Sequence, residues 1–96
     1  MGHRREIMYN GMALNDCANR IRYCIQRLGW SFQGEGPGVI YAGVSISLRS
    51  YGENVRFAFF QDRFVVESKC AFPLQLIDWG KNKENVDKFV QMYFYG

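Results

Sequence analysis

Three residues of one predicted helix, Arg20, Tyr23 and Arg27, have the types and spacing to bind phosphates and aromatic rings. Residues at positions i, i+3 and i+7 share one face of an α-helix, so the two guanidinium groups flank the phenol ring. Guanidinium groups pair with phosphate oxygens, and a tyrosine ring stacks on a base. Together with Arg49, this face predicts nucleic-acid binding. The alternative is a solvated face on which Asp16 and the later arginines complement the helix dipole.

The glycine-rich segment at residues 34–38, GEGPG, is the second pattern that could do chemistry. Such loops cradle phosphates when a helix follows, because the free N–H groups at its start bind the anion. Here the following run, VIYAGVSISL, is typical of a strand, and no Lys-Ser/Thr pair is present. We therefore predict a hairpin loop whose glycines supply positive φ angles, with Glu35 at its tip as a candidate contact to a partner protein.

Patterns for catalysis or metal binding are sparse. The only histidine, His3, lies in a segment without periodicity, so no Cys-His or Ser-His pair can be proposed on rigid elements. The three cysteines lack the C-x-x-C spacing of zinc sites, and no pattern brings two carboxylates together. We expect a protein that is not an enzyme and uses no cofactor or metal. An active site assembled from distant residues is the alternative.

Length and composition predict one domain with a packed core. The chain has 96 residues, of which 48% are hydrophobic and 17% aromatic, and its net charge is +3. No stretch approaches the roughly 18 to 20 apolar residues of a membrane span, and residues 1–10 lack the apolar run of a signal peptide. Cys17 and Cys24 would lie about 10 Å apart along a helix, too far for a disulfide. We expect reduced thiols and a cytoplasmic protein.

A helix and a sheet are expected to position the candidate residues. Residues 1–11 show no periodicity and are predicted to be a flexible N-terminal segment, followed by a single α+β domain at residues 12–96. Apolar residues at intervals of three and four predict an N-terminal helix that Gly29 ends. Alternating apolar residues then predict an antiparallel meander of three to four strands across residues 30–69, including Val44, Ile46 and Leu48.

A second helix is expected at the C-terminus. Pro73 suits the first position of a short helical turn that Gly80 ends, and Asn82 is predicted to cap the final helix. Both helices should cover one face of the sheet, which leaves the other face open.

An aromatic and arginine-bearing surface is the leading functional prediction. Arg56 and Phe60 share the expected open face, and Tyr93, Phe94 and Tyr95 cannot all enter one core stripe of the final helix. Binding energy concentrates in aromatic and arginine side chains. We predict a small protein-binding module, of adaptor or inhibitor type, whose partner is another protein or a second copy of itself. No membrane partner is expected, and nucleic-acid binding is the alternative function.

The predicted order of helix, strands and helix resembles the double-stranded-RNA-binding domain. CIQRLGW and GPGVIY are similar to that family's first helix and its Gly-Pro loop. The resemblance implies a dense lysine run that meets phosphates at the start of the last helix. Here Lys81, Lys83 and Lys88 are interrupted by Glu84 and Asp87, and the family's histidine after Gly-Pro is missing. We therefore do not assign the chain to that family.

Overall fold

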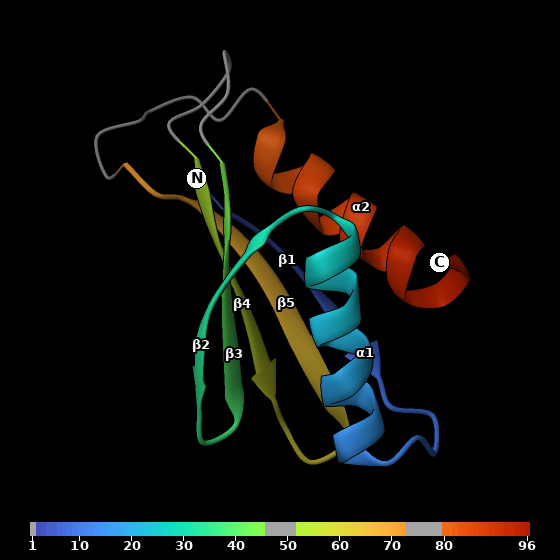
Figure 1. Ribbon diagram of the computed structural model, residues 1–96. Helices are drawn as coiled ribbons and strands as arrows, with labels where there is room; N and C mark the ends of the chain where they lie inside the picture. Colours follow the sequence, from blue (N-terminus) through green and yellow to red (C-terminus); the bar gives the residue numbers. More distant parts are fainter. Residues whose placement is uncertain (1, 46–51, 73–79) are drawn as a thin grey trace.

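The computed structural model describes residues 2–45, 52–72 and 80–96, which form a five-stranded antiparallel sheet and two helices (Figure 1). In chain order the elements are β1 (Gly2–Met8), α1 (Leu14–Arg27), β2 (Ser31–Gly36), β3 (Val39–Val44), β4 (Glu53–Phe59), β5 (Arg63–Cys70) and α2 (Lys81–Tyr95). The strands lie side by side in the order β1-β5-β4-β3-β2, so the first strand pairs with the last. Neither helix of the described chain is long and apolar enough to span a membrane.

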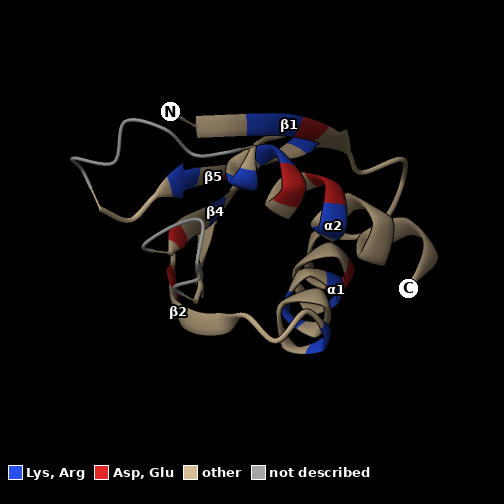
Figure 2. Ribbon diagram, turned by 90° about the horizontal axis from the view of Figure 1, so that it is seen from above, with Lys and Arg blue, Asp and Glu red and all other residues tan. Residues whose placement is uncertain are grey.

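The predicted α+β class is confirmed, with both helices packed on one face of the sheet. The strands follow a curved line in Figure 2, and α1 and α2 lie on its inner side. Alternation along β4 separates the two faces: Val55 and Phe57 are buried under the helices, whereas Asn54 and Arg56 are exposed on the opposite face.

The chain begins with a strand, although a flexible segment followed by a helix was predicted. β1 pairs with β5 from Gly2 opposite Lys69 to Met8 opposite Arg63, which raises the number of strands to five instead of three or four. Ile7 is the one buried residue of this strand, so its sequence shows no apolar alternation. Charged side chains on an edge strand discourage pairing with other chains, and the same charges conceal the strand in the sequence. This order also differs from the helix-first pattern of the double-stranded-RNA-binding domain.

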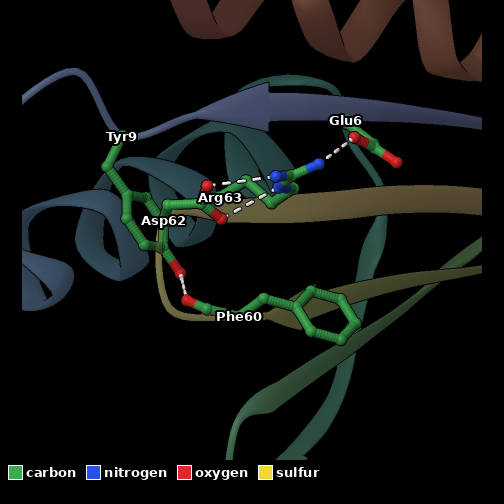
Figure 3. A network of polar contacts seen from close by, with 5 residues as sticks. All are labelled: Glu6, Tyr9, Phe60, Asp62 and Arg63. Atoms are coloured by element: carbon green, nitrogen blue, oxygen red, sulfur yellow. Dashed lines mark hydrogen bonds and ion pairs between the residues drawn. The ribbon is translucent and has the colours of Figure 1, made fainter.

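A polar network fixes β1 against the turn between β4 and β5 (Figure 3). The Tyr9 hydroxyl donates a hydrogen bond to the backbone oxygen of Phe60 at 2.6 Å. Arg63 donates to Glu6 at 2.6 Å and, with two further nitrogens, to Asp62 at 2.9 and 3.0 Å. The hydrogen bonds from Arg63 hold the pKa of Asp62 below its ordinary value. Edge strand and turn are thus joined by side chains as well as by the backbone ladder.

The predicted hairpin in GEGPG is confirmed, with a shorter turn than expected. Residues 34–36 belong to β2, and Pro37 with Gly38 makes the turn into β3. The prediction that Glu35 lies at the tip of the loop is therefore wrong, because Glu35 pairs with Ile40 inside the sheet. Gly38 has a φ of 71°, which a residue with a Cβ rarely adopts. The pairing register shifts between Phe32 and Gly34, which leaves Gln33 in a bulge.

The first helix is confirmed and the cap of the second is not where we predicted it. α1 ends beside Gly29, whose φ of 73° is the left-handed conformation expected there. Gly80 occupies the N-cap of α2 with a φ of 74°, and Asn82 is buried within the first turn. The prediction that Asn82 caps the helix is therefore wrong, because its side chain bonds to Ser68 of β5 instead.

Some sequence predictions lie outside the described residues. These are the helical turn at residues 73–79, the continuation of the third strand through Ile46 and Leu48, and Arg49.

Aromatic rings from both layers form the centre of the core. The ring of Phe64 lies 5.3 Å from that of Tyr93 and 6.1 Å from that of Phe89, and Phe89 lies 4.8 Å from Phe57. β4, β5 and α2 are thereby packed together, and α1 adds Ile21 and the residues around it to the same cluster.

Candidate binding groove between α1 and α2

A groove of about 660 Å³ lies between α1 and the C-terminal half of α2. Its walls combine Met12, Tyr23, Met92 and Phe94 with the polar side chains of Asp16 and Arg20. This half of α2 carries no charged residue and is drawn tan in Figure 2. The volume falls in the range of roughly 300 to 1,000 Å³ that is usual for ligand sites. We call this feature the α1–α2 groove.

The amphipathic pattern of α1 explains why its residues face the groove. Cys17, Ile21 and Cys24 turn toward the core and are fully buried. Residues offset from this stripe, such as Arg20 and Tyr23, therefore project from the helix at intervals of three and four. Arg20 and Tyr23 of the predicted arginine and tyrosine face line the groove, whereas Arg27 lies beyond its lining.

Arg20 is held against the end of α2. Its Nη1 atom donates to the backbone oxygen of Tyr93 at 3.5 Å, and its Cζ atom lies 5.5 Å from the centre of the Tyr93 ring. A cation near a helix C-terminus is favoured by the helix dipole, and the ring adds a cation–π attraction. Arg27 lies in a similar way over Tyr23, at 5.9 Å. Both cations are therefore ordered by tyrosine rings and remain exposed to solvent.

Tyr93 forms the floor of the groove. It is 5% exposed, and its hydroxyl donates to the sulfur of Met12 at 3.9 Å. Burial, reinforced by the neighbouring Cys17 thiol, raises the pKa of Tyr93, so the phenol stays neutral at physiological pH. The next residues along α2 are more accessible: Phe94 is half-exposed and Tyr95 is 80% exposed. The predicted surplus of aromatic residues at the end of this helix thus divides into one core residue and two surface residues.

The other residues predicted for protein binding are not brought to the groove. Arg56 and Phe60 lie on the sheet face that points away from the helices, where Phe60 is 56% exposed. Arg56 forms an ion pair of 3.0 Å with Glu67. The residues that the sequence predicted for one aromatic and arginine-bearing surface therefore lie on two separate surfaces.

Glu35 joins the β2–β3 hairpin to α1. Its two carboxylate oxygens accept hydrogen bonds from Arg22, at 2.8 Å from Nη2 and at 3.0 Å from Nε. Arg22 also donates to Asn19 at 2.8 Å. These bonds engage Glu35 within the molecule, and the hydrogen bonds from Arg22 hold its pKa below the ordinary value.

Replacing Arg22 by glutamine should return the pKa of Glu35 toward its ordinary value, because the hydrogen bonds and the positive charge both favour the carboxylate. Since the pKa is lowered in the folded state, the pair stabilises the fold above the ordinary glutamate pKa, and this contribution is lost as pH falls through the lowered value. An NMR titration of the side-chain carboxyl measures the shift. Asp87, whose pKa is lowered by Lys83, serves as the control and should titrate unchanged. Identical Glu35 titrations in both proteins would contradict the ion pair.

The groove offers little that could make or break bonds. Cys24 lies behind Arg20, and burial raises the pKa of its thiol to about 11, so no thiolate forms there near neutral pH. No group of three or more potential metal ligands occurs in residues 2–45, 52–72 and 80–96. What remains is a lining of thioethers, aromatic rings, the polar side chains of Asp16 and Asn19, and a positioned guanidinium, which suits binding.

A cluster of buried polar side chains under α2 was not predicted. Glu53, Ser68, Asn82 and Asn85 are each at most 1% exposed. Asn85 Nδ2 donates to Glu53 at 2.7 Å and to Ser68 at 3.3 Å, and the Ser68 hydroxyl donates to Asn82 at 2.8 Å. The sequence did contain a signal: Glu53 has the same strand parity as Val55, and the two asparagines are three residues apart on one helix face.

The α1–α2 groove was also missed as a unit. Neither Met12 nor Met92 belongs to a sequence motif that predicts a binding site. Helix packing brings the two residues together from opposite ends of the chain. Arg20 and Tyr93 could be singled out separately, but their contact spans 73 positions. No protein-family model and no curated protein matches the sequence.

Proposed function

We propose that this protein is a small non-enzymatic protein-binding module and that a segment of a partner protein docks in the α1–α2 groove. The observation that carries the proposal is the meeting of exposed aromatic, methionine and arginine side chains around one recess. These residue types are enriched in the buried centres of protein interfaces. Neither an adaptor nor an inhibitor role is favoured over the other by this arrangement.

The lining indicates what the partner segment should carry. Met12 and Met92 have flexible thioether side chains that adapt to an inserted apolar group. Arg20 is already positioned by Tyr93, so pairing with a carboxylate costs little further ordering. Tyr95 lies between the lining residues Phe94 and Gly96 and adds an exposed ring beside the groove. We propose a partner segment with an apolar side chain next to an acidic one.

A photo-cross-linking amino acid at position 23 tests the proposal, with position 41 on the opposite face as the matched control. Both positions hold half-exposed tyrosines, so reactivity and accessibility are comparable. We expect only position 23 to capture a partner protein, and the purified partner protein to bind the native chain in solution. Phe94→Glu and Arg20→Glu should each weaken that binding at least about tenfold, because hot-spot substitutions cost about 1.4 kcal/mol or more.

The groove can also be tested against other occupants. Phe60→Glu, on the open sheet face, should leave the affinity unchanged. Light scattering that shows a dimer broken by Phe94→Glu would identify the partner as a second copy. Capture that is removed by nuclease treatment would favour nucleic acid at Arg20, Tyr23 and Arg27 and would contradict protein binding. A partner that binds the Phe94→Glu variant and the native chain with equal affinity would also contradict protein binding in the groove.

A further inference from the structure

A second surface lies on the face of the sheet that points away from both helices. The strand register places two rows of residues side by side across this face. One row runs through Tyr41, Arg56, Glu67 and Arg4, and the next through Gly43, Asn54, Lys69 and Gly2. Three inter-strand spacings make each row about 14 Å long.

Glycines stand at both ends of the second row, and longer side chains from neighbouring positions lie over them. A Cβ atom at Gly43 would collide with the amide of Gln33, which shows that this bulged side chain lies over the glycine. A Cβ at Gly2 would lie 3.0 Å from Cγ of Lys69, so the lysine stem lies over that end of the row. The result is a recess of about 390 Å³, lined by Gln33, Tyr41, Asn54, Arg56 and Lys69 among others. We call it the open-face recess.

The charges on this face are unevenly distributed. The two rows carry three cations, Arg4, Arg56 and Lys69, against one acid, Glu67, which is paired with Arg56. Toward the β4–β5 turn the balance reverses, because Arg63 lies between Glu6 and Asp62. A polyanion would therefore be attracted to the open-face recess and repelled from the other end of the face.

We infer that the open-face recess binds single-stranded RNA. The ring of Tyr41 is 44% exposed and offers a platform on which a base stacks. Arg56 and Lys69 line the recess, and Arg4 lies outside it at the far end of the row that contains Arg56. These three cations meet the phosphates on either side of that base. The amides of Gln33 and Asn54 each donate and accept hydrogen bonds, so they suit both base edges and the ribose 2′-hydroxyl.

A single strand fits this surface better than a duplex does. Stacking on Tyr41 requires an unpaired base whose face is free. The recess is open, and no helix or strand protrudes from it that could enter the groove of a duplex. The inference concerns the opposite side of the molecule from the α1–α2 groove, so either proposal can fail alone.

Fluorescence anisotropy of labelled oligouridylate, titrated with the full chain, tests the inference. We expect micromolar binding at about 50 mM salt, and a slope of log K against log salt of roughly −2 for three phosphate contacts. Tyr41→Ala should weaken binding about tenfold or more, as removal of a base-stacking ring does. Lys69→Gln should reduce the salt slope by about 0.7. Both residues are exposed, and circular dichroism checks that the variants fold.

Matched controls come from the other end of the same face. Phe60→Ala removes a ring about as exposed as that of Tyr41, and Arg63→Gln removes an arginine that is ion-paired as Arg56 is. Both variants should bind the RNA like the native chain. Oligothymidylate should bind more weakly, since it lacks the 2′-hydroxyl. The inference is overturned by an absence of binding at about 50 mM salt, by equal affinity for oligothymidylate or for duplex RNA, or by losses in Phe60→Ala equal to those in Tyr41→Ala. Binding that depends on Arg20 and Arg27 instead would move the RNA to α1 and overturn it as well.

Discussion

Replacing Phe64 by alanine should lower the free energy of unfolding by about 3–5 kcal/mol, the usual cost of deleting a buried aromatic ring. Phe64 is fully buried, and its ring contacts those of Tyr9, Phe59, Phe89 and Tyr93. These partners belong to three segments of the chain, the end of β1, β4 and α2, so no single side-chain movement can refill the cavity. A domain of this size has a total stability of about 5–14 kcal/mol, so the variant should be partly unfolded under mild conditions.

Urea unfolding followed by circular dichroism measures this effect. Phe60→Ala is the control, because it removes the same ring from an exposed position four residues away and should change the stability by less than about 0.5 kcal/mol. A loss below about 1 kcal/mol for Phe64→Ala would contradict the central role of this ring. The groove should be affected along with the core, since Tyr93 belongs to both.

Elements with one clearly apolar face were predictable from the sequence. In α1 the residues Cys17, Ile21 and Cys24 recur at helical spacing and are the ones that the structure buries. In β4 the alternation of Val55 and Phe57 with polar residues identifies both the strand and its buried face. These patterns can be read within one element, because each helix or strand packs against the core on one side and faces solvent on the other.

β1 could not be recognised in the same way, because its stability comes from partners elsewhere in the chain. Its backbone pairs with β5, and Arg63 and Phe60 hold Glu6 and Tyr9 through side-chain bonds. An edge strand with charged side chains has the composition of a loop, and only the strand beside it shows that it is not one.

The sequence predicted several residues of the candidate site but not how these residues are arranged in space. Arg20 and Tyr23 were singled out for phosphates and Tyr93 for protein binding, yet the structure places all three in one groove. Their contacts depend on how α1 crosses α2, which neither helix encodes alone. Arg56 and Phe60 were placed on the correct sheet face by alternation, but the recess beside Arg56 depends on the bulge at Gln33.

Replacing Asn85 by alanine should cost about 2–4 kcal/mol, more than its size suggests. The change removes one donor from Glu53 and one from Ser68, both of which are at most 1% exposed and cannot recover the loss from bulk water. It also leaves a small cavity under the first turns of α2. Asn19→Ala is the control: that side chain bonds to Arg22 on an exposed surface, so its loss should cost less than about 0.5 kcal/mol.

A double-mutant cycle separates the lost hydrogen bond from the lost volume. Glu53→Leu keeps a side chain of similar size and removes the carboxylate that accepts from Asn85 at 2.7 Å. If the two groups interact, Asn85→Ala in the Glu53→Leu background should cost about 1–3 kcal/mol less than it costs in the native chain, whereas a cavity alone would cost the same in both. Additivity within about 0.5 kcal/mol would show that Asn85 stabilises α2 through packing and that the buried polar cluster does not act as a unit.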